Sequence, residues 1–282
     1  MPYYYGTPYT DYIYASSLAD SIDAQDGNDF IYAGAGADAV SAGGGNDFVH
    51  GDDGNDTMSA GDGYDTVSGD RGADRIYGDG GDDILYGGID NDDLYGGVGG
   101  DSLSGDDGAD RLYGGDNNDR LYGGAGNDND LRGDSGGDEI YGGTGADRLL
   151  GGSGADYLYG GSSGDTLYGG TGNDRIYGGG GVDILYGGSD NDNFYFYEND
   201  SGGYYGGDTA DRIYDFENND QILLHGSYSQ GGGDYPFDGQ YIIDWVAAEG
   251  AWLVTWNAPD DPGFSTILVF GDNPTGDISS FG

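Results

Sequence analysis

Aspartate is the residue type whose spacing in this sequence could do chemistry. Twenty successive nonamers carry an aspartate immediately before a strand-like triplet, from Asp20 to Asp192. Every interval is nine residues except the one between Asp128 and Asp138, where one residue is inserted. Short carboxylates beside glycine-rich turns are hard oxygen ligands, and these suit Ca²⁺ better than softer ions. The spacing therefore predicts a row of calcium sites.

The predicted metal ligands are the aspartates of the second and later repeats, and glycine carbonyl oxygens are expected to complete each site. Glycine suits such turns because it permits positive φ and a close approach of the backbone to an ion. The expected ligands are Asp29, Asp38, Asp47, Asp56, Asp65, Asp74, Asp83, Asp92, Asp101, Asp110, Asp119, Asp128, Asp138, Asp147, Asp156, Asp165, Asp174, Asp183 and Asp192.

Some turns depart from the commonest pattern. In five of them another residue replaces the glycine that usually stands two residues before the aspartate. We expect these turns to bind calcium weakly or not at all. The replacements are Leu18, Asp90, Asn117, Ser163 and Asp190, in turns 15–20, 87–92, 114–119, 160–165 and 187–192. Five other turns carry an extra aspartate, which is either a further ligand or a solvated charge: Asp52, Asp70, Asp79, Asp106 and Asp134.

The elements that must position these aspartates follow from the same period. Two residues after each aspartate stands a large apolar residue, from Ile22 to Phe194, except in the repeat with the insertion, where Leu131 comes three residues after Asp128. Neighbouring residues of a strand point to opposite faces, so this apolar residue points inward and its flanks point outward. A period of nine is too short for a repeat made of a helix and a turn, but it fits a six-residue turn and a three-residue strand. Two nonamers then form one coil, and stacked coils form two parallel sheets around an apolar core.

Composition agrees with a protein that needs cations. The chain has 282 residues, 64 of them glycine, and a formal charge of −45, which opposes compaction. High charge with abundant glycine usually predicts disorder, but 27 tyrosines argue for a folded chain. Nucleic acid and anionic membranes are poor partners for such a charge. Calcium between successive turns, roughly 14 to 18 ions, would cancel most of it, and its binding energy would be folding energy.

Several classes of site are excluded by residue type. The sequence has no cysteine and only two histidines, His50 and His225, so disulfides and zinc sites of the Cys/His type are not expected. No nucleophile or metalloprotease signature occurs, so an enzyme is not expected. The N-terminus lacks the features of a cleaved signal peptide, and no apolar stretch approaches the ~20 residues of a membrane span. An ice-binding surface would need regular rows of Thr and Asn on the turns, and no such order is present.

The turns GGAGND (123–128), GGTGAD (142–147), GGSGAD (151–156) and GGTGND (169–174) resemble the GGxGxDxUx nonamer of the RTX (repeats-in-toxin, haemolysin-type) calcium-binding family. The segment DRIYDFENNDQILL (211–224) is similar to the element that follows RTX repeats in serralysins and alginate-epimerase R-modules.

The resemblance implies an all-β chain: a right-handed parallel β-roll (β-helix) solenoid of nonapeptide repeats with a C-terminal β capping region. Residues 1–14 would be a lead-in, 15–195 the calcium-binding β-roll, and 196–282 the cap with a type I secretion signal. After Asn193 the nonamer rhythm is expected to stop, and 241–245, 251–256 and 265–270 read as strands of a closing sheet.

The function implied is that of a secreted, extracellular or cell-surface protein that folds on multiple Ca²⁺ outside the cell and is exported by the type I secretion machinery. Two alternatives stay open: a module that binds polysaccharide or a cell surface through outward Tyr and Arg side chains, and a C-terminal region detached from a secreted enzyme. For the outward rows themselves we favour a simpler interpretation, in which tyrosines of one face stack on one another and arginines pair with aspartates or stack on tyrosines.

Overall fold

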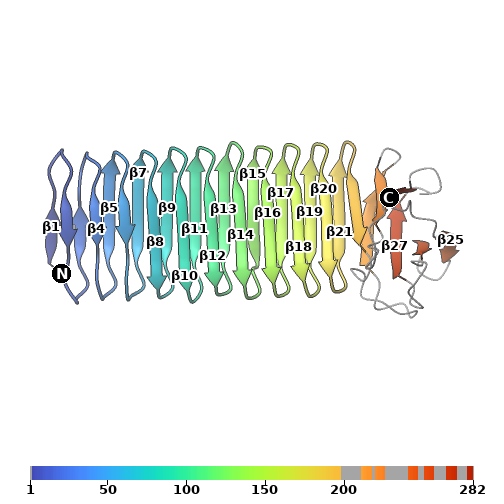
Figure 1. Cartoon of the computed structure of the whole chain (residues 1–282), viewed down its shortest axis with the longest axis horizontal. Coiled ribbons are helices and arrows are strands. Elements are labelled where there is room, and N and C mark those ends of the chain that lie inside the picture. Colours follow the sequence, from blue (N-terminus) through green and yellow to red (C-terminus); the bar gives the residue numbers. More distant parts are fainter. Residues whose placement is uncertain are drawn as a thin grey trace, which may run out of the picture.

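The computed structural model describes residues 2–197, 211–217, 220–225, 241–246, 251–256, 265–271 and 278–281. Every regular element in these residues is a β-strand. The strands form an elongated stack of coils in which each coil adds one strand to each of two sheets (Figure 1). The described residues contain no helix long and apolar enough to cross a membrane. The predicted all-β solenoid with two parallel sheets is therefore confirmed.

The first sheet contains the odd-numbered strands of the solenoid and is called the odd sheet. Its strands are β1 (Tyr3–Tyr5), β3 (Ser21–Asp23), β5 (Ala39–Gly44), β7 (Thr57–Asp62), β9 (Arg75–Gly80), β11 (Asp93–Val98), β13 (Arg111–Asp116), β15 (Asp130–Ser135), β17 (Arg148–Ser153), β19 (Thr166–Thr171), β21 (Ile184–Ser189) and β23 (Asp211–Phe216).

The second sheet contains the even-numbered strands and is called the even sheet. Its strands are β2 (Tyr12–Tyr14), β4 (Phe30–Tyr32), β6 (Phe48–His50), β8 (Thr66–Arg71), β10 (Ile84–Ile89), β12 (Ser102–Asp107), β14 (Arg120–Ala125), β16 (Glu139–Thr144), β18 (Tyr157–Ser162), β20 (Arg175–Gly180), β22 (Asn193–Tyr197), β24 (Gln221–His225) and β28 (Ile278–Phe281).

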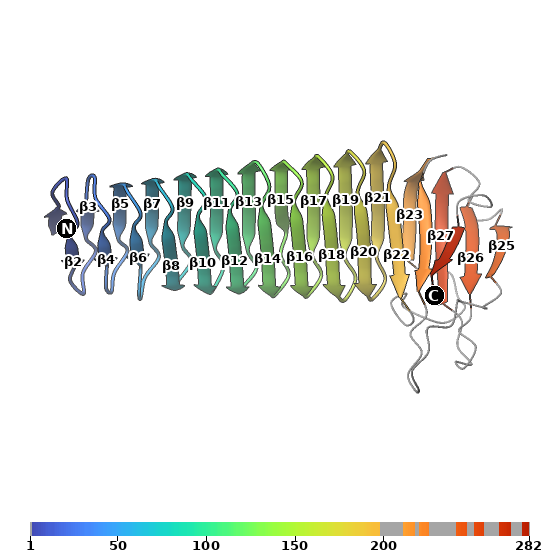
Figure 2. The same cartoon turned by 45° about the horizontal axis from the view of Figure 1, so that its top comes forward.

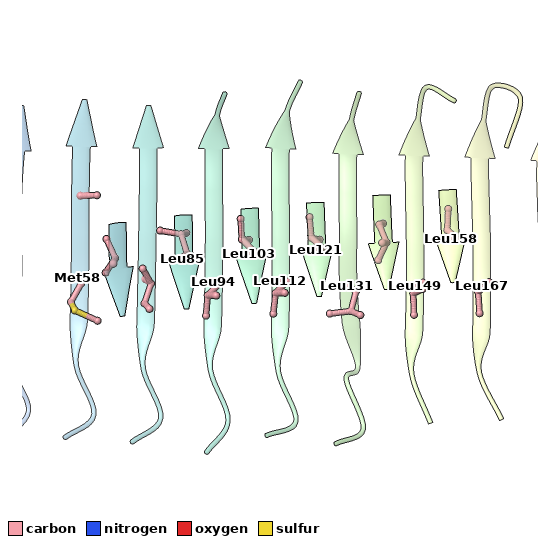
Figure 3. Packing of buried hydrophobic residues seen from close by; sticks show 14 of the residues in the cluster. Met58, Leu85, Leu94, Leu103, Leu112, Leu121, Leu131, Leu149, Leu158 and Leu167 are labelled. Carbon is pink, nitrogen blue, oxygen red and sulfur yellow. The ribbon is translucent and has the colours of Figure 1, made fainter. Parts of the chain in front are cut away.

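The register repeats every 18 residues, which is one coil. Leu85 pairs with Leu103 in the even sheet, and Leu94 pairs with Leu112 in the odd sheet. These side chains meet between the sheets and are fully buried (Figure 3). The inserted residue is absorbed in the turn before β15, because Leu131 still pairs with Leu112 and is itself buried. The predicted apolar core is confirmed at every repeat.

Most strands are longer than the three residues that the sequence predicts. From β7 to β21 each strand has six residues, because pairing between coils continues through the glycine pair that follows the apolar triplet. Gly97, for example, pairs with Gly115 at φ values of 112° and 114°, which glycine adopts without strain. A Cβ on Gly97 would lie 2.3 Å from the carbonyl oxygen of Asp79. The coils therefore stack this closely only because glycine occupies this place.

Both ends of the solenoid extend beyond the nonamers counted in the sequence. Strands β1 and β2 lie within residues 1–14 and pair in parallel with β3 and β4. At the other end β23 and β24 continue the two sheets after residues 198–210, which lie outside the described part of the chain. The division of the chain at residues 15 and 196 stays a prediction.

The three predicted strand runs near the C-terminus are all strands. They are β25 (Tyr241–Val246), β26 (Ala251–Trp256) and β27 (Ser265–Gly271). β27 pairs in parallel with β23, and β26 and β25 follow it in antiparallel order, so the three extend the odd sheet (Figure 2).

Candidate metal centre

The repeated aspartates lie in two rows, one along each edge of the solenoid where a turn enters a strand. Each row is called an aspartate ladder. The carboxylates fold inside their turns, and from Asp20 onward their residues are 0–3% exposed. The first ladder contains Asp20, Asp38, Asp56, Asp74, Asp92, Asp110, Asp128, Asp147, Asp165, Asp183 and Asp211, and the second contains Asp11, Asp29, Asp47, Asp65, Asp83, Asp101, Asp119, Asp138, Asp156, Asp174, Asp192 and Asp220.

One oxygen of each carboxylate links consecutive coils. The backbone N–H of Asp92, for example, donates to Asp110 Oδ1 across 2.8 Å, and the N–H of Asp110 donates to Asp128 Oδ1 across 2.8 Å. We call this contact the rung hydrogen bond. It survives the inserted residue, since Asp119 donates to Asp138 Oδ1 at 2.9 Å. Each carboxylate thus accepts the backbone N–H of the ladder aspartate one coil earlier, which immediately precedes a strand.

The other oxygen, Oδ2, is buried and has no hydrogen-bond donor among the described residues. A buried carboxylate oxygen without a partner is unfavourable unless a proton or a cation compensates it. The row of such atoms is therefore the clearest sign of a ligand in this structure. They belong to Asp29, Asp38, Asp47, Asp56, Asp65, Asp74, Asp83, Asp92, Asp101, Asp110, Asp119, Asp128, Asp138, Asp147, Asp156, Asp165, Asp174 and Asp192.

From Asp74 onward each unpartnered oxygen borders a space that glycine leaves free. A Cβ added to Gly78 would lie 2.5 Å from Asp83 Oδ2 and 2.6 Å from the carbonyl oxygen of Gly96, which belongs to the next coil. At Gly123 the corresponding distances, to Asp128 Oδ2 and the Gly142 carbonyl, are 2.3 and 2.5 Å. A carboxylate and a carbonyl oxygen on neighbouring coils are the ligand types that calcium prefers.

The first coils differ at this place in a way that the sequence reasoning missed. Alanine replaces glycine five residues before several ladder aspartates, as at Ala24, Ala33, Ala42 and Ala60. These methyl groups are fully buried in the apolar core. The space beside the carboxylate is therefore smaller in these coils than in the coils after Gly69.

Side chains alone do not build a metal site. Within the described ranges, no three His, Cys, Asp or Glu side chains come together in a group that could hold a metal ion. A cation held between coils would thus take most of its ligands from backbone carbonyls, with aspartate supplying the charge. The ligand assignments made from the sequence stay a prediction.

Burial is the largest influence on the pKa values of these ladder carboxyls, and it raises them. Desolvation raises the pKa of Asp83, Asp119 and Asp165 to about 8, although the rung hydrogen bond from the preceding coil lowers it. For Asp74 and Asp110 the same cause raises the pKa to about 7. A cation that binds these carboxylates must therefore compete with protons near neutral pH.

The five extra aspartates, each at the second position of its turn, lie outside the ladders. They occupy left-handed positions, with φ between 67° and 70°, at which glycine stands in other coils. Asp70 contacts His50 Nδ1 at 2.7 Å and accepts from the Ser68 hydroxyl at 2.8 Å, while Asp106 accepts from Ser104 at 2.7 Å. These side chains bond to outward residues of the strands.

The turns in which another residue replaces the glycine two positions before the ladder aspartate keep their ladder carboxylates in place. Asp90, Asn117, Ser163 and Asp190 have φ between 81° and 89°, whereas Gly99 and Gly126 have 146° at the same place. Asp92 and Asp192, at the ends of two such turns, still accept rung hydrogen bonds at 2.8 and 3.0 Å. The replacement changes the path of the turn without removing the carboxylate.

Three ladder members, Asp11, Asp211 and Asp220, were not among the aspartates predicted from the sequence. All three precede an isoleucine by two residues, and both Asp11 to Asp20 and Asp211 to Asp220 span nine residues. The rhythm therefore resumes after the interruption that follows Asn193, contrary to the expectation that it stops. The signal that could have found these aspartates was the D-x-I triplet at this spacing.

The outward tyrosines stack on one another along both sheets. On the even sheet Tyr122, Tyr141, Tyr159, Tyr177 and Tyr195 form a continuous stack with ring centroids 4.4–5.1 Å apart. On the odd sheet Tyr77, Tyr95 and Tyr113 form one stack and Tyr168, Tyr186 and Tyr214 another. The prediction that tyrosines of one face stack on one another is confirmed.

The outward arginines contact acidic residues and tyrosines. Arg75 and Arg111 both pair with Asp93, at 2.7 and 2.9 Å. Arg132 and Arg148 both pair with Asp130, at 2.8 and 3.0 Å. Arg132 also lies over the Tyr113 ring and Arg148 over the Tyr168 ring. The pairing expected from the sequence is therefore present.

Two parallel sheets edged by ladders of buried aspartates and glycine turns define the chain as a calcium-binding β-roll. The model of the RTX calcium-binding nonapeptide repeat (4 copies) matches residues 5–40, 32–67, 59–94, 68–103, 95–130, 132–166 and 159–194. The chain belongs to this family.

Comparison with solved structures gives a further similarity. A hyperactive, Ca²⁺-dependent, β-helical antifreeze protein from an Antarctic bacterium has 17% sequence identity, with 79% of this chain and 86% of that chain covered and a TM-score of 0.38. No curated protein matches the chain.

Proposed function

We propose that this protein is a secreted calcium-dependent β-roll whose solenoid folds when Ca²⁺ enters between successive coils outside the cell. The observation that carries the proposal is the row of buried Oδ2 atoms without donors, repeated along both edges. A bound divalent cation would compensate two buried charges at once. Binding energy would then be folding energy, because the coils that form a site exist only in the folded chain.

The proposed ligands are the nineteen ladder aspartates from Asp29 to Asp192 predicted above. Each would supply a carboxylate oxygen to an ion that also contacts carbonyl oxygens of the next coil, as Asp83 Oδ2 and the Gly96 carbonyl are placed to do. An interior ion would therefore join two coils, so loss of one coil weakens the sites beside it. Calcium binding is expected to be cooperative along the solenoid.

The compartment in which the chain would fold follows from the calcium concentration there. Weak multi-carboxylate sites of extracellular modules bind calcium in the range of about 10⁻⁴ to 10⁻³ M. At cytosolic calcium the chain would stay unfolded, since its charge of −45 opposes collapse. We propose that it is exported in that state by a type I system and folds outside.

Equilibrium dialysis against calcium, with magnesium as competitor, tests the binding. We expect many ions per chain, roughly 14 to 18, with little displacement by equimolar magnesium, because magnesium demands a stricter octahedral geometry. A count of about two or fewer, or equal displacement by magnesium, would contradict the proposal.

The runner-up proposal is a module that binds polysaccharide or a cell surface through its outward rows. It has less support, because the tyrosine ring faces stack on one another and the guanidinium groups of Arg75 and Arg111 share Asp93. A pulldown with acidic and neutral polysaccharides on the calcium-loaded protein separates the two proposals. The third proposal, a region detached from a secreted enzyme, is tested by activity screening.

A further inference from the structure

The outermost turns of the ladders are chemically different from the interior turns. At Asp20 the Oδ2 atom accepts hydrogen bonds from both the backbone N–H and the hydroxyl of Ser16, each at 2.7 Å. At Asp11 the Oδ2 atom accepts from the N–H of Thr7 at 2.6 Å and from its hydroxyl at 3.0 Å. The oxygen that lacks a donor in the interior is therefore fully bonded in turns 6–11 and 15–20.

Thr7 and Ser16 stand at the second position of their turns, where most interior turns have the second residue of the glycine pair and the others have aspartate or glutamine. A glycine there has no hydroxyl to donate. The hydrogens of Ser16 point at the side of the carboxylate that an interior turn would present to a cation, and a cation is repelled by N–H and O–H hydrogens. Ala15, which packs against the core, also replaces the glycine beside this carboxylate.

The remaining oxygen of Asp20, Oδ1, is buried without a donor for a simple reason. Its rung partner would be the residue 18 positions earlier, which is Pro2 and has no N–H. The ladder therefore starts at this point, and its first rung is missing.

The second ladder closes in a similar way at its C-terminal end. Asp220 Oδ2 accepts the backbone N–H of Glu217 at 2.7 Å, while Asp220 Oδ1 accepts the rung hydrogen bond from Asp192 at 3.0 Å. At three of the outermost positions, protein donors thus bond the carboxylate oxygen that has no donor in the interior turns.

We infer that turns 6–11 and 15–20 are metal-free end turns. In them, serine and threonine donors compensate the buried carboxylate oxygen that calcium compensates in the interior turns. The inference rests on the proposed calcium function. These turns give the first coil a closed conformation without an ion, and this coil then supplies one side of the first calcium site. The calcium array accordingly begins after Asp20.

Asparagine variants of the full chain test the inference. In Asp20→Asn the amide oxygen can keep both Ser16 donors, and the amide nitrogen takes the place where Pro2 offers no donor. Asp11→Asn can likewise keep the Thr7 donors. In Asp92→Asn and Asp101→Asn, interior members of the same two ladders, the charge that would face the cation is lost.

The measurement is bound calcium per chain at saturation, with the calcium midpoint followed by circular dichroism. We expect D20N and D11N to bind as many ions as the unmodified chain with a midpoint within twofold, and D92N and D101N each to lose at least one ion. Loss of an ion in D20N or D11N would overturn the inference. Full retention in D92N and D101N would instead overturn the ligand assignment of the proposed function.

A second pair of variants tests the hydroxyl itself. Ser16→Ala removes the hydroxyl donor, while Ser17→Ala changes an exposed neighbour in the same turn. At saturating calcium we expect amide exchange of residues 15–23 to accelerate at least tenfold in S16A and less than twofold in S17A, with the ion count unchanged in both. Equal exchange in the two variants, or a gain of one ion in S16A, would overturn the inference.

Discussion

At the scale of the residue, the two carboxylate oxygens of each interior ladder aspartate have different roles. Oδ1 accepts a rung hydrogen bond, and Oδ2 is buried without a donor, as at Asp110. The rung hydrogen bond to Oδ1 requires only an acceptor oxygen, whereas the buried charge at Oδ2 requires a compensating positive charge. An amide in place of the carboxylate preserves the first and removes the second.

Asp110→Asn is therefore expected to raise the calcium concentration at the folding midpoint several-fold and to lower the melting temperature in calcium. Asp107→Asn is the matched control, because Asp107 lies in the same turn but is exposed. Circular dichroism at increasing calcium measures both midpoints. Similar midpoints for the two variants would show that the buried carboxylate has no special role.

The glycine beside the carboxylate gives a second prediction. Gly78→Ala places a methyl group 2.5 Å from Asp83 Oδ2 and 2.6 Å from the Gly96 carbonyl oxygen. Overpacking of this kind typically costs about 1–3 kcal/mol, and it also fills the space between two oxygens. Gly80→Ala is the control, since its nearest neighbour would be Asp62 Oδ1 at 3.4 Å.

Chemical denaturation in saturating calcium compares the two alanine variants. We expect the Gly78 variant to lose stability and bound calcium, while the Gly80 variant stays close to the unmodified protein in both. The opposite order would mean that the space beside Asp83 is not part of a site.

At the scale of the element, neighbouring strands are held by outward stacks as well as by the core. Tyr159 lies between Tyr141 and Tyr177 with ring centroids 4.8 and 4.4 Å away. Aromatic pairs contribute about 0.5–1.5 kcal/mol each beyond burial. The stack therefore supports the even sheet across several coils.

Tyr159→Ala is expected to destabilise the calcium-loaded protein by about 1–3 kcal/mol through loss of both stacking contacts. Tyr86→Ala is expected to cost much less, because its partners in the register on the two neighbouring strands are Ser68 and Ser104 rather than tyrosines. Thermal unfolding in calcium measures the difference, and equal losses would contradict a stabilising role of the stack.

Much of the element arrangement could be predicted from the sequence because the period fixes it. The aspartate spacing and the apolar residue two positions later determine both the two sheets and the inward face, and Leu131 kept its place despite the insertion. The strand length could not be predicted, because pairing through glycine depends on how closely the coils approach. Asp11, Asp211 and Asp220 were missed because their turns lack the glycine pattern, although their carboxylates meet the same backbone donors.

At the scale of the whole molecule, the ladders couple folding to pH. The ladder carboxyls have pKa values raised from 3.8 to about 6 at Asp101 and about 8 at Asp119 by burial. The folded chain thus binds more protons than the unfolded chain between about pH 4 and pH 8. Without calcium, this contribution to stability is fully present below about pH 4 and is lost as pH rises through the folded pKa values.

We therefore expect the chelated chain to gain β structure on acidification from pH 8 to about pH 4.5. In the presence of calcium, protons and ions compete for the same oxygens, so the calcium midpoint should rise as pH falls below about 7. Circular dichroism with chelator, and calcium titrations at pH 6 and pH 8, measure the two effects. A chelated chain that loses β structure on acidification would contradict the burial of the ladder carboxyls.

The most direct test of the account is a calcium titration of the chelated full chain at pH 7.5, followed by far-ultraviolet circular dichroism with magnesium as the control. If calcium binding drives folding, we expect a disordered spectrum in chelator and a sharp, cooperative gain of β signal between about 10⁻⁴ and 10⁻³ M calcium, with no such gain in magnesium. A β-rich spectrum that is the same in chelator and in calcium would contradict it.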